Sequence, residues 1–232
     1  DPGTEAAMAG NCNGGSTPLT PAPPDQPFTS PFFNFIGDLT KAEMQMAHQA
    51  ASDIAQRMAQ EITGLSAEEI FLKVFGGPIT LANIDKYLVD AAGFSVYAIA
   101  SQSELLITVG IKELTNHYLL VHEIFHLFDI VLLGEAANQA LWDAQRAPGS
   151  TFPNRPNLAG DSNETWGFAG GNFSNWQKSR SGASGEEYAD MGIGWTYNQW
   201  DVLPTGEWSA FGKARADFMN VNMAIWLNQL LP

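Results

Sequence analysis

Residues 119–128 of the chain read LLVHEIFHLF, a run in which apolar residues surround His122, Glu123 and His126. Glu123 is the only carboxylate in this run, so the pattern predicts a largely buried helix that ends near Gly134. Because a helix turns by about 100° per residue, histidines four positions apart lie on one face, where both imidazoles can reach one tetrahedral metal ion. The stretch therefore predicts an apolar helix and a metal site on that helix.

Glu123 follows the first histidine directly and is expected to point to the side of the metal ion. There its carboxylate can take a proton from a water molecule activated by the ion, instead of ligating the ion itself. The HExxH motif therefore indicates a zinc-dependent hydrolase with Glu123 as the general base. The alternative is a buried helix that carries these residues by chance. It is disfavoured because two of only four histidines in the chain have this spacing.

A third ligand must come from another part of the chain. The longer motif HExxHxxGxxH is absent, because Asp129 stands at the glycine position and Leu132 at the position of the third histidine. Asp129 is itself a candidate ligand, although its short side chain favours a structural use. Further along, residues 185–190 read GEEYAD, in which Glu186 and Asp190 are four positions apart and share a helical face.

Together, HEIFH and the downstream EEYAD resemble the two motifs of the gluzincin branch of the zincin metallopeptidases, whose second motif has the form E-x-x-(S/A)-D or E-x-x-A-E. The resemblance implies that Glu186 is the third zinc ligand. It also implies that Asp190 accepts a hydrogen bond from the outer nitrogen of a zinc-bound histidine, with His122 as the first choice.

For the whole chain, the same resemblance implies an α+β, zincin-like metallopeptidase domain. Such a domain has a small sheet with a backing helix, an active-site helix and a helical C-terminal part. The implied activity is zinc-dependent hydrolysis of peptide bonds in a peptide or protein substrate.

Glu187 remains an alternative third ligand, since it is adjacent to Glu186. The two side chains point about 100° apart around a helix, and Asp190 shares its face with Glu186 and not with Glu187. The helical geometry therefore favours Glu186 without excluding Glu187.

A side chain that stabilises the oxyanion formed by attack on a carbonyl is expected near the third ligand. Tyr197 is the first candidate, because it lies three turns past Glu186 on the same face, and Tyr188 is the second. His117 and Arg180 are alternates. For both tyrosines, packing in an amphipathic helix is nevertheless the commoner role and the alternative that the sequence favours.

Hydrophobic periodicity predicts the other elements. Beside the motif helix, the expected helices cover residues 39–62, 66–74, 81–89, 186–200 and 208–230. Strands are expected at 94–100 and 105–109, as a hairpin or as neighbours in a sheet. In the family that the chain resembles, an edge strand beside the cleft pairs with an extended peptide, and 105–109 is the candidate for that strand. The aperiodic stretch 147–185 predicts a long loop.

The composition predicts one hydrophobic core. With 232 residues, of which 45% are hydrophobic, the chain is long enough for a single domain. Residues 1–30 are rich in Gly, Pro and small residues, which predicts a flexible linker or strap ahead of one domain at 31–232. Cys12 is the only cysteine, so the chain has neither an intramolecular disulfide nor a cysteine-rich zinc site.

The charge balance restricts the partners. Eleven basic residues against 25 acidic ones give a formal net charge of −14, which argues against binding to nucleic acids or anionic membranes. The longest apolar run, 119–133, is interrupted by polar residues and too short to span a membrane. This acidity is typical of a secreted or extracellular enzyme, and it leaves the oligomeric state open.

Two other functions remain open at this stage. The chain could be an effector or toxin domain of a larger secreted protein that acts on one specific target. It could also be a non-catalytic binding module that keeps zinc for stability.

Overall fold

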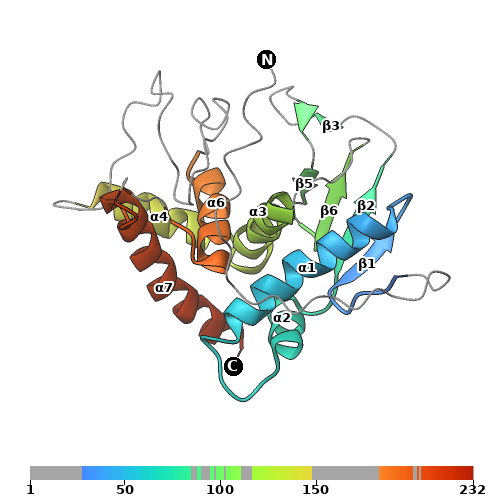
Figure 1. Ribbon diagram of the computed structural model, residues 1–232, viewed down its shortest axis with the longest axis horizontal. Helices are drawn as coiled ribbons and strands as arrows, with labels where there is room; N and C mark the ends of the chain where they lie inside the picture. Colours follow the sequence, from blue (N-terminus) through green and yellow to red (C-terminus); the bar gives the residue numbers. More distant parts are fainter. Residues whose placement is uncertain are drawn as a thin grey trace.

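The computed structural model describes residues 28–84, 88–89, 95–96, 98–101, 103–110, 117–147, 183–200, 203 and 205–231. The predicted linker at 1–30 and the predicted loop at 147–185 lie largely outside these ranges, as do Cys12 and Arg180. Within them, a sheet and several helices form one α+β arrangement (Figure 1), so the α+β prediction is confirmed.

The main sheet has four strands in the order β1-β2-β6-β5. Strands β1 (Phe33–Ile36), β2 (Ile79–Asn83) and β6 (Leu106–Val109) are parallel, and β5 (Ala98–Ala100) pairs antiparallel with β6. Alternate residues of the parallel strands are buried on one face: Phe33, Ile79, Leu81, Ile107 and Val109. This period of two places the apolar face of the sheet against the helices.

A separate two-stranded ladder joins β3 (Leu88–Val89) to β4 (Ser95–Val96). The predicted helix at 81–89 is therefore wrong. Leu81, Ile84 and Leu88 recur at helical spacing, but short apolar runs fit a helix or a buried strand equally well. Pairing decides the outcome, because Leu81 lies opposite both Phe35 and Ile107 in the centre of the sheet.

The strands predicted at 94–100 and 105–109 are neighbours, as expected, since β5 pairs with β6. The assignment of 105–109 as the edge strand is wrong, because β6 lies between β2 and β5. In the described part of the sheet, the edge on this side is β5. The order could not be read from the sequence, since β2 inserts beside β6 from a distant part of the chain.

The first two helices begin at capping boxes. The side chain of Thr40 starts α1 (Lys41–Met58) with Glu43 as its partner, and Ser66 starts α2 (Ala67–Phe75) with Glu69. Helix α2 ends at Gly76, whose φ of 70° is in the left-handed region that glycine adopts without strain. Helices were expected at both places, and α1 is shorter at each end than predicted.

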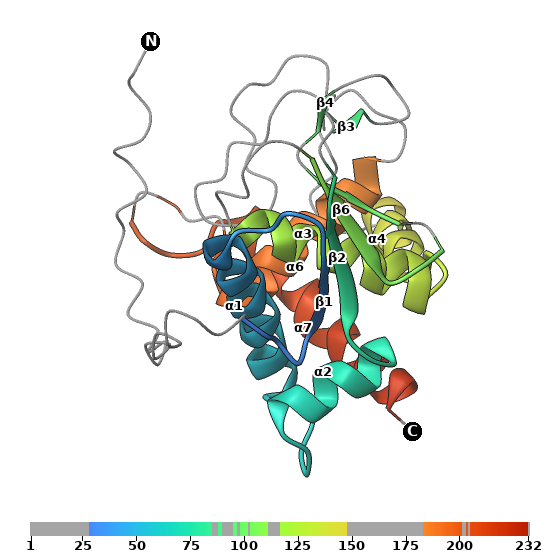
Figure 2. The same ribbon diagram turned by 90° about the vertical axis from the view of Figure 1, so that its right-hand side faces the viewer.

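The HExxH motif lies on α3 (His117–Leu127), which continues as one π-helical segment, Phe128–Leu132. Helices α1 and α3 lie side by side on one face of the sheet (Figure 2). The carboxylate of Asp129 accepts backbone N–H bonds from Ala137 and Asn138, at 2.9 and 3.1 Å. Asp129 therefore joins the motif helix to α4 (Ala136–Arg146), a helix that the periodicity did not predict.

The C-terminal part consists of α6 (Ala183–Tyr197) and α7 (Ala210–Leu230). Both helices were predicted, with different ends. Helix α6 packs antiparallel to α3: Tyr197 contacts Tyr118 near the start of α3, whereas Glu186 lies beside His126 near its end. This packing brings the two sequence motifs together.

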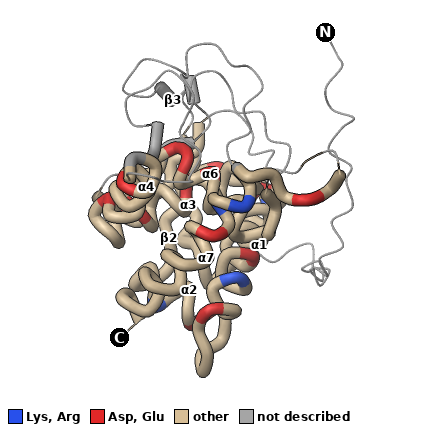
Figure 3. The backbone as a smooth tube through the Cα atoms, turned by 90° about the vertical axis from the view of Figure 1, so that its left-hand side faces the viewer, with Lys and Arg blue, Asp and Glu red and all other residues tan. Residues whose placement is uncertain are grey.

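Acidic positions occur over most of the described elements, with few basic ones between them (Figure 3). Within the described ranges, no helix combines the length and the apolar character that a membrane-spanning segment needs.

Candidate metal centre

Three side-chain atoms from α3 and α6 converge between these two helices. The Nε2 atoms of His122 and His126 are 2.9 Å apart, and Glu186 Oε2 lies 3.2 Å from the first and 3.6 Å from the second. A tetrahedral zinc ion with bonds of about 2.0–2.1 Å separates its ligand atoms by about 3.3–3.4 Å. The three distances therefore match three corners of such a tetrahedron, and the group could hold a metal ion.

The Glu186 carboxylate shows what kind of group fits there. Its Oε2 atom is buried and has no hydrogen-bond partner of good geometry. Burial raises the pKa of Glu186, but the neighbouring imidazoles of His122 and His126 lower it by more, so this carboxylate is ionised. A buried, ionised oxygen that faces two ring nitrogens is well matched by a small cation, and two histidines with one carboxylate form a donor set that suits zinc.

Asp190 orients the first histidine. Its Oδ1 atom lies 2.9 Å from His122 Nδ1, and both residues are buried. An Nδ1–H that donates to this carboxylate leaves Nε2 with its lone pair toward the site. Burial lowers the pKa of His122, but the charge and the hydrogen bond of Asp190, together with Glu186 and Glu123, outweigh burial, so the pKa of His122 is raised well above 6.5.

Glu123 lies next to this group without belonging to it. Its side chain is buried, and its Oε2 atom accepts a hydrogen bond of 2.9 Å from the backbone N–H of Ala100 in β5. Glu123 thus reaches from the metal-site helix to the edge strand of the sheet. The second oxygen, Oε1, takes no part in this bond.

Glu187, the alternative ligand, points the other way. Its carboxylate forms an ion pair with Arg215 of α7 and accepts a hydrogen bond of 2.8 Å from Gln145 of α4. The Glu187 and Arg215 side chains are almost completely buried. Glu187 therefore joins α4, α6 and α7, while Glu186 faces the histidines.

Neither candidate tyrosine points its hydroxyl at the group of three. Tyr188 is fully buried, and its hydroxyl donates to the sulfur of Met223 at 3.8 Å. The Tyr197 hydroxyl donates to Asp53 of α1 at 2.9 Å, and its ring contacts those of Tyr118 and His117.

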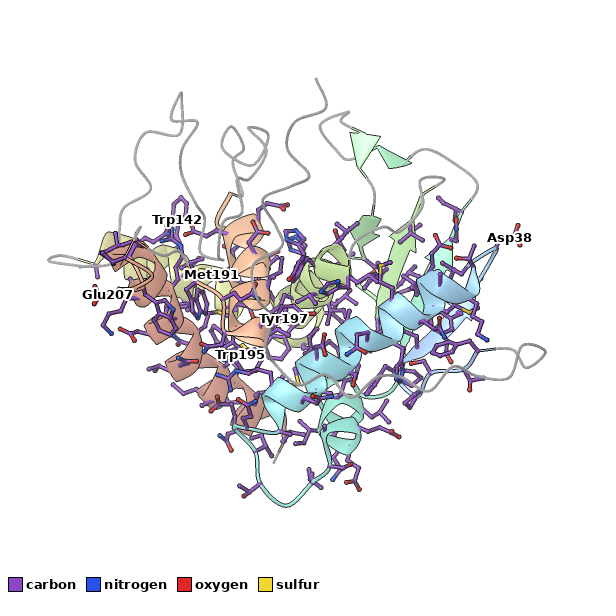
Figure 4. The ribbon with its side chains drawn as sticks, viewed as in Figure 1. Asp38, Trp142, Met191, Trp195, Tyr197 and Glu207 are labelled. Atoms are coloured by element: carbon purple, nitrogen blue, oxygen red, sulfur yellow. The ribbon has the colours of Figure 1, made fainter. Side chains whose placement is uncertain are left out.

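Helical geometry also separates Tyr197 from the ligands. It lies 11 residues after Glu186 on the same helix, which is about 16 Å along the helix axis. Figure 4 labels Tyr197 and Trp195 at the end of α6 that is away from Glu186. The spacing of three turns that placed Tyr197 on the Glu186 face also places it far from the metal-binding atoms.

Two features of this region were missed by the sequence reasoning. One is the buried pair of Glu187 and Arg215, for which a basic residue within the apolar pattern of α7 was an available signal. The other is the backbone N–H of Ala100. It has no sequence signal, because every residue except proline carries one.

No protein-family model matches the chain, and no curated protein or solved structure is similar enough to it to count as a match. The possible metal site therefore stands on the two motifs and on the geometry that joins them.

Proposed function

We propose that this chain is a zinc-dependent hydrolase of peptide bonds, with the ion held by His122, His126 and Glu186. One observation carries the proposal: two histidines of an HExxH motif and a distant glutamate meet within 4.8 Å of one another, beside the glutamate of the motif. An HExxH sequence that occurred by chance has no reason to meet a buried, ionised carboxylate on another helix.

The zinc ion, when bound, supplies a Lewis acid that polarises a carbonyl group and lowers the pKa of a water molecule. Glu123 then acts as general base and general acid. Its Oε1 atom, which accepts no hydrogen bond from the part of the chain that the structure describes, takes a proton from the attacking water and delivers it to the leaving amine. Asp190 holds the Nδ1–H of His122, which keeps the other ring nitrogen available as a ligand.

A peptide substrate is suggested by β5, which is the edge strand on this side of the described sheet. This strand lies beside α3, and those of its outward backbone groups that Glu123 does not occupy can form hydrogen bonds with an extended chain. The net charge of −14 favours neutral or basic peptides over acidic ones. We also propose that the protein is secreted, because its acidic composition is typical of secreted enzymes.

Metal analysis and the Glu123→Gln variant test this function. We expect about one zinc per chain in both proteins, and cleavage of a complex peptide mixture by the parent only. The rate should fall by about 10²–10⁴-fold in Glu123→Gln, because it loses general acid–base catalysis. The matched control is Glu68→Gln, an exposed acid on α2, which should cleave like the parent.

A Glu123→Gln variant that cleaves as fast as the parent contradicts the proposal. A zinc-loaded parent that cleaves nothing in the mixture also contradicts it as a general peptidase. If expression of that parent then arrests growth and Glu123→Gln does not, the effector alternative is favoured. If neither protein has any effect, the zinc-stabilised binding module is favoured.

A further inference from the structure

The bond between Glu123 and Ala100 joins the metal-site helix to the sheet. The Glu123 Oε2 atom and the Ala100 nitrogen are 2.9 Å apart, although the two residues are 23 positions apart in the chain. Within the described part of the chain, Ala100 is the only hydrogen-bond donor to this carboxylate. Glu123 is also almost fully buried, so this bond replaces water at one of its oxygens.

The pairing of β5 shows which way the Ala100 N–H points. The Ser101 N–H donates to the Leu106 carbonyl at 2.8 Å, and Ile99 lies opposite Thr108 in the same antiparallel register. In an antiparallel ladder, hydrogen-bonded pairs alternate with pairs whose backbone groups face outward. Ala98 and Ala100 therefore direct their N–H groups away from β6, toward the open edge of the described sheet.

The backbone of Ala100 thus lies where a peptide would pair with β5 and where Glu123 is held. An extended peptide that adds to β5 would pair with these outward groups, but the N–H of Ala100 is already bonded to Glu123. The edge therefore offers a peptide the carbonyl of Ala100 but not its N–H. Any peptide that pairs with β5 consequently lies next to Glu123, in a register that the occupied N–H of Ala100 restricts.

We infer that the backbone N–H of Ala100 is the positioning group for Glu123, fixing Oε2 so that Oε1 is presented for proton transfer. The role in proton transfer rests on the proposed function, whereas the bond itself does not. Glutamate has three side-chain torsions, and one bond to a rigid strand removes most of their freedom. A base that wanders by about 1 Å can lose about 100-fold in rate.

Amide hydrogen exchange tests the bond without any assay of activity. In the full chain, the Ala100 amide should be protected although it faces the open edge. In Glu123→Ala it should exchange at least about 10-fold faster, because its acceptor is gone. The Ser101 amide, which donates to Leu106 inside the ladder, is the internal control and should not change.

Proline substitution tests the role in catalysis. Ala100→Pro removes the N–H and places a ring carbon where Glu123 now binds, and proline is tolerated on an edge strand when the lost N–H faces outward. The matched control is Ala98→Pro, which puts the same ring on the same edge, two residues before the N–H that Glu123 binds. Ala100→Gly, made in the parent, keeps the N–H and should cleave at the parent rate to within about 2-fold.

We expect kcat of Ala100→Pro to be about 100-fold below that of Ala98→Pro, with equal zinc content and similar unfolding midpoints. KM should rise only in Ala98→Pro, because the Ala98 N–H is the outward donor that Glu123 does not occupy. Equal kcat values for the two proline variants overturn the inference, as does an Ala100 amide that exchanges equally in the parent and in Glu123→Ala. Should Ala100→Pro fail to fold, the exchange rates of the Ala100 amide in the parent and in Glu123→Ala decide whether Ala100 holds Glu123. Ala100→Gly then shows whether the N–H suffices without the methyl group. A parent that binds zinc but cleaves nothing contradicts the proposed function instead, and the exchange rates still decide whether Ala100 holds Glu123.

Discussion

Two adjacent glutamates with identical side chains have opposite surroundings in this protein. Glu186 faces two imidazoles, and Glu187 forms a buried ion pair with Arg215 between α6 and α7. The difference follows from the rotation of about 100° between successive helical residues. One position therefore belongs to the candidate metal centre, and its neighbour to the packing of the C-terminal helices.

Glutamine at each position separates these two roles. We expect Glu186→Gln to lose more zinc affinity than the roughly 10–100-fold that is typical for residues that only support a ligand, with little change in the stability of the zinc-free protein. Glu187→Gln should keep its zinc affinity and lose about 3–5 kcal/mol of stability, because it breaks a buried ion pair with Arg215. Chelator competition and urea unfolding measure the two effects, and a reversed pattern would show that Glu187 is the ligand.

The packing of α3 against α6 determines whether the ligands meet. The two helices lie close together at Gly192 of α6, where an added Cβ atom would lie 2.2 Å from the Phe125 ring. Glycine at this position lets α6 approach the motif helix, so that Glu186 on the same helix reaches both histidines. A side chain at 192 would push the two helices apart.

Alanine in place of Gly192 should therefore destabilise the protein by about 1–3 kcal/mol or more, and should also weaken zinc binding. The same substitution at Gly185, on the same helix, is the control. Its nearest neighbour would be 3.7 Å away, and replacing a helical glycine should leave the stability unchanged or raise it by up to about 1 kcal/mol. Equal unfolding free energies for the two variants would contradict the close packing at Phe125.

Elements that depend on local sequence patterns could be predicted, whereas elements that depend on distant parts of the chain could not. Helices α1, α2, α6 and α7 have long periodic patterns or capping residues, and each was expected near its place. Strand β2 was mistaken for part of a helix because its five residues satisfy either period, and its pairing with β1 and β6 is non-local. The position of β5 at the edge also could not be predicted, because it results from the non-local pairing of β2 with β6.

The candidate site was predictable to a different degree for each residue. His122 and His126 follow from local spacing. Glu186 followed from a helical face shared with Asp190 and from a resemblance between short motifs. The surroundings of Tyr197 could not be predicted, because they depend on the antiparallel direction of α6 and on Asp53 in a distant helix.

For the molecule as a whole, a metal ion would join two helices that lie far apart in the chain, α3 and α6. Two ligands come from α3 and one from α6, so zinc bound to the folded state should raise its stability by about 2.7 kcal/mol when the free zinc concentration is 100 times Kd. Thermal unfolding with zinc and with EDTA measures this difference. A His126→Ala variant should unfold at the same temperature in both conditions.

The stabilisation by zinc should also depend on pH. Because the pKa of His122 is raised well above 6.5 in the folded protein, a proton on this ring stabilises the zinc-free fold below pH 6.5, and this stabilisation is lost as the pH rises through the raised value. Zinc needs the unprotonated ring, so its affinity rises over the same range. The gap between the unfolding temperatures with zinc and with EDTA should therefore widen from acidic to alkaline pH. In Asp190→Asn, which removes one of the charges that raise this pKa, the change should be smaller.

Helix α6 is anchored at both ends by contacts that involve no ion. Near its C-terminus, the Arg57 guanidinium lies 4.4 Å from the centre of the Trp195 ring and donates to the Trp195 carbonyl. Near its N-terminus, Glu187 is held by Arg215 and Gln145. The entropy of bringing Glu186 to the histidines is consequently lost during folding and not when the ion arrives. The three candidate ligands are therefore in place before the ion binds, and binding of the ion should require almost no rearrangement of the backbone.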